Sequence, residues 1–193
     1  MSLRVLLVQE NTTYNGYIIR PVLETVFARC GRPNFRISPL PGRPPEGYED
    51  AKQALRRSFA SKNVMAALWL FVCDSDTQDK SAELAALEKE AQSGGVALIC
   101  CAAEPEVEAW LVAGHLDKLE GKAWSELRRH VSFKEEIFEP FLKAHGNSMM
   151  RGGGRSDLMK TALQNYSGLC QRCPEIKRLE ERISEFLNKD QHE

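Results

Sequence analysis

The sequence lacks long hydrophobic runs, since none of its apolar stretches approaches the roughly eighteen residues that a membrane-spanning helix needs. The first ten residues also lack the length and layout of a secretory signal peptide. We therefore expect a cytoplasmic protein that does not associate with a membrane.

A large excess of one charge is missing as well, because 26 Lys and Arg stand against 27 Asp and Glu, for a net charge of −1. This balance argues against the uniformly basic surface of an architectural DNA-binding protein. The charges are nevertheless divided along the chain, with a net +5 in residues 1–63, −7 in 64–114 and +1 in 115–193. Such a division suits a phosphate-bearing partner guided to a metal site, although solvated helix faces explain much of the charge equally well.

The six cysteines do not complete a zinc site. Cys170 and Cys173 have CxxC spacing, but no second CxxC or histidine pair supplies the other two ligands. Cys73, Cys100 and Cys101 lie within apolar segments. We expect these three to be reduced thiols in the core.

What the sequence does contain is an alternation of short apolar runs and helical segments. The run that begins at Ala67 has seven apolar residues before its first carboxylate, which predicts a strand buried on both faces. We expect strands at 3–8, 34–38, 67–73 and 96–103, and helices at 15–30, 49–62 and 80–92. This alternation predicts an α/β fold with a mostly parallel central sheet of about four strands flanked by helices.

No convincing strand follows residue 103, so the second half is expected to be helical. We expect helices at 104–114, 124–130, 135–144, 156–166 and 174–188. This pattern predicts an α/β core over residues 1–114 and a helical extension over 115–193 that packs on the core. The last of these helices has one apolar face, which suits either capping of the core or formation of a homodimer.

Three carboxylates follow the predicted strands at the positions where α/β proteins bind ligands. Asp74 and Asp76 end the central run, and Glu10 ends the first strand. If the chain is still extended there, Asp74 and Asp76 project from the same side of the strand. Carboxylates held close together repel unless protons or a cation neutralise them, and Mg²⁺ is a cation that prefers oxygen ligands. We therefore expect a site for Mg²⁺ or Mn²⁺.

Other interpretations of this segment stay open. Residues 74–77 fit the Asp-x-Asp-x-Thr pattern of haloacid-dehalogenase-type phosphatases, in which Asp74 would be the nucleophile. That pattern belongs on the first strand, however, and no later strand ends in the Asp pair that would complete such a site. A glycosyltransferase Asp-x-Asp is a second alternative, for which the chain is short. A pair of surface aspartates in a turn is the third.

The order of the acidic residues resembles a known family. A Glu at the end of the first strand and an Asp-x-Asp at the end of a later buried strand are similar to the Toprim domain of topoisomerases, primases and overcoming-lysogenization-defect nucleases. The segment 102–111, with Glu108 two residues before Trp110, is similar to the Glu-x-Trp-Leu signature of small bacterial Toprim-like proteins of the DUF4276 and RloB kind. The resemblance covers roughly residues 3–114.

The resemblance implies a Toprim-like (Rossmannoid) fold and a role for these acids in catalysis. Asp74 and Asp76 would hold the metal, and Glu10 would complete its coordination or act as general base. Glu104 and Glu108 are four residues apart, so we expect them to share one helix face, from which they could add a metal ligand. The family often has a second acid a few positions after the first Glu. Tyr14 stands in that region here, which puts a second metal in doubt.

A glycine-rich segment before a predicted helix is the other candidate site. Arg151 and Arg155 flank three glycines, and Lys160 lies about one turn inside the helix. Backbone N–H groups at a helix N-terminus attract anions, so a nucleic-acid phosphate could bind there. A flexible loop is an equally good interpretation. No Lys-Ser or Lys-Thr follows the glycines, so this is not a Walker motif.

The function expected from the resemblance is Mg²⁺-dependent cleavage of a nucleic-acid phosphodiester, in DNA or RNA, within a phage-defence or mobile-element system. The first alternative is a non-catalytic Toprim-like module that binds nucleic acid or a partner ATPase. A metal-dependent phosphatase is a weaker alternative. The residues alone support only an acidic site for a divalent metal at the carboxyl edge of an α/β sheet.

Overall fold

The computed structural model of the chain describes residues 2–11, 13–59, 65–119 and 121–189. Four strands form one sheet in which every neighbouring pair is parallel, in the order β2-β1-β3-β4. The strands are β1 (Leu3–Gln9), β2 (Phe35–Pro39), β3 (Leu68–Asp74) and β4 (Leu98–Ala103). The expected α/β fold with a parallel four-stranded sheet is therefore confirmed.

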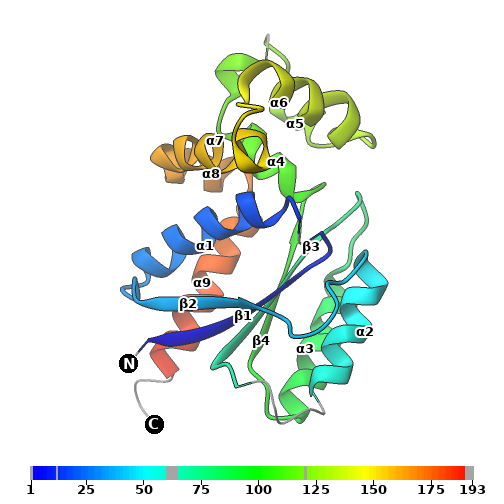
Figure 1. Cartoon of the computed structure of the whole chain (residues 1–193), viewed down its shortest axis with the longest axis vertical. Coiled ribbons are helices and arrows are strands. Elements are labelled where there is room, and N and C mark those ends of the chain that lie inside the picture. The colour runs from blue at the N-terminus through cyan, green and yellow to red at the C-terminus, as the bar shows by residue number, and fades with distance from the viewer. Residues whose placement is uncertain (1, 12, 60–64, 120, 190–193) are drawn as a thin grey trace.

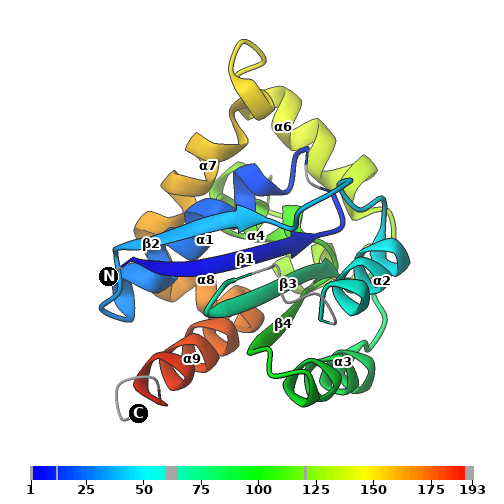
Figure 2. The same ribbon diagram turned by 60° about the horizontal axis from the view of Figure 1, so that its bottom comes forward.

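Helices join these strands and cover both faces of the sheet (Figures 1 and 2). The helices between strands are α1 (Gly16–Arg29), α2 (Tyr48–Phe59) and α3 (Ser81–Ser93). The helices after β4 are α4 (Val107–Ala113), α5 (Trp124–Leu127), α6 (Glu139–His145), α7 (Arg155–Ala162), α8 (Tyr166–Arg172) and α9 (Pro174–Lys189). A π-helical turn at Lys134–Phe138 leads into α6. Short 3-10 turns lie at Leu116–Lys118, Arg151–Gly154 and Leu163–Asn165.

The two faces of the sheet divide the core, because successive strand residues point to opposite sides. Val5 and Leu7 face α1, α4, α7, α8 and α9, whereas Leu6 and Val8 face α2 and α3. The central strand β3 contributes buried residues to both clusters, as its continuous apolar run predicted. The expected core thiols Cys73, Cys100 and Cys101 and the remaining cysteines are all free.

The helices after residue 114 pack on the sheet face that α1 covers, and they share one apolar cluster with it. The apolar face of α9 is used in this way, since Ile176, Leu179, Ile183 and Leu187 are buried there. Of the two uses expected for this face, the structure shows capping of the core. Within the described part of the chain, no helix is both long and apolar enough to cross a membrane.

Several expected boundaries differ from the structure. The helix expected at 49–62 ends at Phe59, and its expected last residues lie outside the described residues. The helix expected at 156–166 is α7 followed by a 3-10 turn, and a separate helix, α8, continues to Arg172. The side chain of Asn165 accepts a hydrogen bond from the N–H of Gly168 and so caps the start of α8.

Candidate functional site

The candidate site lies between β1 and β3, on either side of which the chain adds its next strand in opposite directions along the sheet. From β1 the chain crosses to β2 on one side through α1, and from β3 it crosses to β4 on the other side through α3. The carboxyl ends of β1 and β3 therefore flank the topological switch point of the sheet, the position at which open α/β sheets bind their ligands and which we call the crevice. Glu10 follows β1 and Asp74 ends β3. The N–H of Asp74 donates a hydrogen bond of 2.9 Å to Oε1 of Glu10, which joins the two strand ends.

Asp74 is held at this crevice by the helix that follows β4. Its Oδ1 accepts a 2.8 Å hydrogen bond from the N–H of Val107, the first residue of α4. Burial, and after it the carboxylates of Glu108 and Glu10, raise the pKa of Asp74 to about 8, while the bond from Val107 acts in the opposite direction. The raised pKa reflects first the burial of this carboxyl group and second its acidic neighbours, so both disfavour its charged form.

Glu10 has a similar environment. Burial raises the pKa of Glu10, and the bond from the Asp74 N–H and the charge of Lys80 partly offset this effect. Two carboxyl groups at one crevice, both with raised pKa values, are a frequent feature of functional sites.

Asp76 does not lie beside Asp74 in the way that an extended chain would place it. The strand ends at Asp74, and the backbone then turns, with φ values of 52° at Asp76 and 61° at Thr77. Oδ2 of Asp76 is 2.9 Å from Nζ of Lys80, and the Asp76 side chain is 59% exposed. We expected Asp74 and Asp76 on the same side of the strand only if the backbone stays extended through residue 76. The backbone turns before that residue, so this condition is not met.

Lys80 is a site residue that the sequence analysis missed. Its Nζ donates to the backbone carbonyl of Asp74 at 2.7 Å and to Oδ2 of Asp76, and it lies 4.1 Å from the ring centroid of Tyr48. The side chain is 8% exposed. Its spacing of four residues from Asp76 was a poor signal, because that spacing brings opposite charges together on a helix, whereas Asp76 lies in the turn before α3.

Glu108 lies near Asp74 as a buried group, and its role as a metal ligand stays a prediction. Its side chain is 1% exposed, and Oε1 lies 3.2 Å from Nζ of Lys134. Its neighbour Glu106, which the sequence analysis did not select, is half-buried. Burial and the charge of Glu108 raise the pKa of Glu106 to about 7. Glu106 and Glu108 therefore add negative charge beside Asp74.

Glu104 lies elsewhere, and the expectation that it shares a helix face with Glu108 was wrong. The helix begins at Val107, with Glu106 in an extended conformation before it. Pro105 explains this late start, because a residue that precedes proline is disfavoured in the helical conformation. The carboxylate of Glu104 instead forms an ion pair of 2.7 Å with Arg128.

The glycine-rich segment forms a packed turn. Gly152, Gly153 and Gly154 have φ values of 70°, 65° and 82°, which glycine adopts at little cost. A Cβ on Gly152 would lie 2.5 Å from the ring of Tyr17, so the turn also packs closely on α1. The interpretation of this segment as a flexible loop is not supported, because the turn is fixed by contacts within the chain. Phosphate binding at this segment stays a prediction.

The three basic residues expected to bind phosphate are separated. Arg155 is half-buried, and its guanidinium lies 4.6 Å from the ring centroid of Tyr14 and donates to the Gly152 carbonyl at 2.8 Å. Burial lowers the pKa of Arg155, and the charge of Glu108 opposes this effect. Arg151 is exposed. Lys160 lines a cavity that Arg20 of α1 also lines and that does not include Arg151 or Arg155 among its described lining residues. Of the three, only Arg155 is shown to interact with the acidic group.

The side chains at the crevice suit a hard divalent cation, because carboxylate oxygens are the ligands that Mg²⁺ prefers. Among the described residues, however, no three Asp, Glu, His or Cys side chains are arranged to hold a metal together. Mg²⁺ commonly retains several water ligands and uses only one or two protein carboxylates. Glu10 and Asp74 fit a site of that kind.

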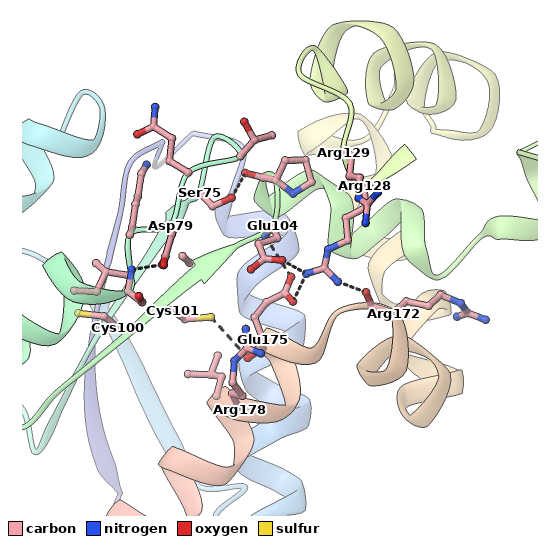
Figure 3. A pocket seen from close by; sticks show the side chains of 18 of the residues that line it. Ser75, Asp79, Cys100, Cys101, Glu104, Arg128, Arg129, Arg172, Glu175 and Arg178 are labelled. Atoms are coloured by element: carbon pink, nitrogen blue, oxygen red, sulfur yellow. Dashed lines mark hydrogen bonds and ion pairs between the residues drawn. The ribbon is translucent and has the colours of Figure 1, made fainter. Parts of the chain in front are cut away.

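A second feature, unexpected from the sequence, is a cavity of about 850 Å³ beside the crevice. Figure 3 shows that Arg128, Arg129, Arg172 and Arg178 surround it together with Glu104 and Glu175. Glu104 directly follows β4, and the other residues come from α8, α9 and the segment at the end of α5, all of which are distant from one another in the sequence except α8 and α9. Only folding brings them together.

Comparison with protein-family models finds no match to this chain. No curated protein matches it either. No solved structure matches it. Function is therefore inferred from the geometry of the crevice and its surroundings.

Proposed function

We propose that this chain is a divalent-metal-dependent phosphodiesterase that acts on nucleic acid, with Glu10 and Asp74 as the ligands of Mg²⁺ or Mn²⁺. One observation supports this most strongly. Glu10 and Asp74 lie at the carboxyl ends of β1 and β3, where the N–H of Asp74 donates to Glu10, and burial together with the charges of Glu108 and Glu10 raises the pKa of Asp74 to about 8. A bound divalent cation would favour the charged form of this carboxyl group.

Each residue of the crevice has a role in this proposal. A bound Mg²⁺ supplies charge that neutralises the phosphodiester and lowers the pKa of a water molecule. Asp74 is oriented by the N–H of Val107. Glu10 is the second metal ligand in this proposal. In the alternative arrangement, in which Asp74 alone holds the metal, Glu10 would instead accept the proton of the attacking water, since burial raises its pKa towards neutrality.

The cations around the crevice would contact the phosphate groups of the substrate. Lys80 lies beside Asp76, Lys134 beside Glu108, and the guanidinium of Arg155 is held over the ring of Tyr14. Charge-assisted hydrogen bonds from such groups stabilise a phosphate whose negative charge grows in the transition state. The choice of nucleic acid rests on the resemblance of the order Glu10, Asp74, Asp76 to that of Toprim domains.

A non-catalytic nucleic-acid-binding module is the second candidate, and one contact favours it. Nζ of Lys80 lies 2.9 Å from Asp76 and already neutralises the carboxylate that would otherwise complete a three-acid metal site. A module of this kind would bind nucleic acid without cutting it, whether or not a metal is present.

Nucleic-acid cleavage with the Asp74→Asn variant separates the two candidates. Labelled single-stranded and duplex DNA and RNA are incubated with the protein in Mg²⁺ or Mn²⁺ and analysed for shortened products. We expect cleavage by the wild type and a loss of at least about a hundredfold in the variant, because Asn keeps the acceptor for Val107 but not the charge.

The matched control is Asp117→Asn, which removes one charge from an exposed position in the 3-10 turn Leu116–Lys118. This control should cleave like the wild type. Binding of nucleic acid with no products under any metal condition would contradict the phosphodiesterase and support the binding module. Hydrolysis of a small phosphate ester without nucleic-acid cleavage would instead support a phosphatase.

A further inference from the structure

The cavity beside β4 has a strongly cationic lining. β4 is an edge strand, and the cavity lies along it between α3 and α9, with the segment around α5 on its third side (Figure 3). Six cationic and four acidic side chains line it, so the lining has an excess of positive charge. The cations are Lys80, Arg128, Arg129, Arg172, Arg178 and Arg182. The neighbouring crevice is acidic by contrast.

Two of these arginines are fixed by carboxylates and form the framework of the cavity. Arg128 pairs with Glu104 and Glu175 at 2.7 Å each, and Glu175 is almost fully buried. Arg182 pairs with Glu88 at 2.8 Å and donates to the backbone carbonyl of Cys100 on the free edge of β4. These contacts give the lining a defined shape before any ligand binds.

Arg129 and Arg178 differ from the fixed pair. Both are exposed and line the cavity, and neither forms an ion pair with a carboxylate of the described residues. Two unneutralised guanidinium groups around one concave surface favour an anion, and a guanidinium matches the geometry of a phosphate particularly well.

The cavity and the crevice share one turn of the chain. Ser75 and Lys80 line the cavity, and the same Lys80 bonds to Asp76 and to the carbonyl of Asp74. The N–H groups of Ser75 and Asp76 both donate to the carbonyl of Pro105, which also borders the cavity. A ligand that fills the cavity therefore lies next to the residues of the crevice.

We propose that this cavity binds the phosphate groups of a nucleic-acid single strand, whose adjoining phosphodiester then reaches Glu10 and Asp74. A volume of about 850 Å³ is that of a small-ligand pocket. The cavity therefore accommodates a few nucleotide units of a single strand and is too small for a duplex. Among the described residues, Trp124 is the one aromatic side chain of the lining. Recognition through the arginines therefore involves the phosphates and is independent of base sequence. The inference rests on the proposed function for the nature of the substrate.

The test is binding of labelled single-stranded oligonucleotides of DNA and of RNA, measured by fluorescence anisotropy in EDTA at several salt concentrations. The variant is Arg129→Ala with Arg178→Ala, two exposed changes that leave the framework pairs intact. We expect the affinity to fall about tenfold or more and the slope of log affinity against log salt to decrease by about 1.4, since each phosphate contact on a single strand contributes about 0.7.

The matched control is Arg4→Ala with Arg36→Ala, which removes the same charge from two exposed, paired positions on β1 and β2, away from the β4 edge. An equal loss of affinity in this control would overturn the proposal, as would an unchanged affinity in the cavity variant. A mononucleotide that competes at the same concentration as the oligonucleotide would overturn the assignment to a strand.

These outcomes are independent of the metal. Because binding is measured in EDTA, a failure of Mg²⁺ to bind or of the protein to cleave contradicts the proposed function and leaves the binding result as it stands. Oligonucleotide binding that depends on Arg129 and Arg178 supports the cavity as a strand-binding site in either case.

Discussion

Asp74 combines features that rarely occur together in a carboxyl group without a functional reason. It is largely buried, it lies near the carboxylates of Glu10 and Glu108, and it still receives a hydrogen bond from the N–H of Val107. A carboxyl group kept in such a place destabilises the metal-free protein at neutral pH, because burial disfavours its charged form. Functional sites often retain costs of this kind.

This cost predicts that Asp74→Asn stabilises the metal-free protein in a pH-dependent way. The folded pKa of about 8 lies above the ordinary value of 3.8. The stability associated with the protonated group is therefore fully present below about pH 4 and is lost as pH rises through 8. We expect the variant and the wild type to be equally stable near pH 4 and the variant to be more stable by about 5 kcal/mol at pH 8.5, since the two pKa values differ by about four, each unit corresponds to about 1.4 kcal/mol, and this stability is then almost fully lost.

Urea denaturation in EDTA at both pH values measures this difference. Taking the difference between the two proteins at each pH removes the contributions of other titrating groups. A variant that is less stable than the wild type at pH 8.5 would contradict the raised pKa of Asp74, and so would a difference that does not change with pH.

Single residues of the crevice were predictable only where a strand ends. Glu10 and Asp74 were found because an apolar run followed by an acid marks the carboxyl end of a buried strand. Lys80 and Glu106 were missed, since their importance depends on the turn after β3 and on the late start of α4. Neither the turn nor the late helix start produces a periodic pattern of apolar residues from which it could be predicted.

At the scale of helices, the position of α4 sets the position of the site. Its first N–H holds Asp74, and its C-terminal end packs against α7, the helix that begins with Arg155. Gly114 caps α4 at that contact. A Cβ placed on Gly114 would lie 2.0 Å from Cβ of Ala162, so the two helices approach at a distance that only glycine allows.

This close approach predicts that Gly114→Ala is destabilising by about 3 kcal/mol, because overpacking forces backbone shifts. Gly94→Ala is the matched control. Both glycines cap a helix, with φ of −80° at Gly114 and −87° at Gly94, and a Cβ on Gly94 meets its nearest neighbour at 3.3 Å. Thermal and urea unfolding should show the large loss only for Gly114→Ala. Equal effects of the two changes would show that the contact between α4 and α7 is looser than described.

The existence of most helices was predictable, but some of their ends were not. The period of apolar residues predicted α1 and α9 to within one or two residues, and composition together with the glycines at 94 and 95 predicted α3 equally closely. The separation of α7 from α8 was missed, although Asn165 is a good helix-capping residue and offered a local signal. A short helix such as α8, with seven residues, has too few turns for its period to be distinctive.

At the scale of the whole molecule, sheet and helical extension form one structure around a shared core. The apolar cluster on the α1 face includes residues from β1 to α9. This arrangement places Arg128, Arg172 and Arg178 around one cavity next to the β3 turn. Such a cavity was not predictable from the sequence, because its residues are spread over helices whose relative positions are set only by packing.

The central claim is that Glu10 and Asp74 form a divalent-cation site at the β1–β3 crevice, and calorimetric titration of Mg²⁺ into the metal-free protein tests it most directly. The variant is Glu10→Gln, which keeps an acceptor for the Asp74 N–H, and the control is Glu24→Gln at an exposed position on α1. We predict one saturable binding event in the wild type and in the control, and a loss of affinity of about tenfold or more in Glu10→Gln. Absence of saturable Mg²⁺ or Mn²⁺ binding to the wild type, or binding that Glu10→Gln leaves unchanged, would contradict the account.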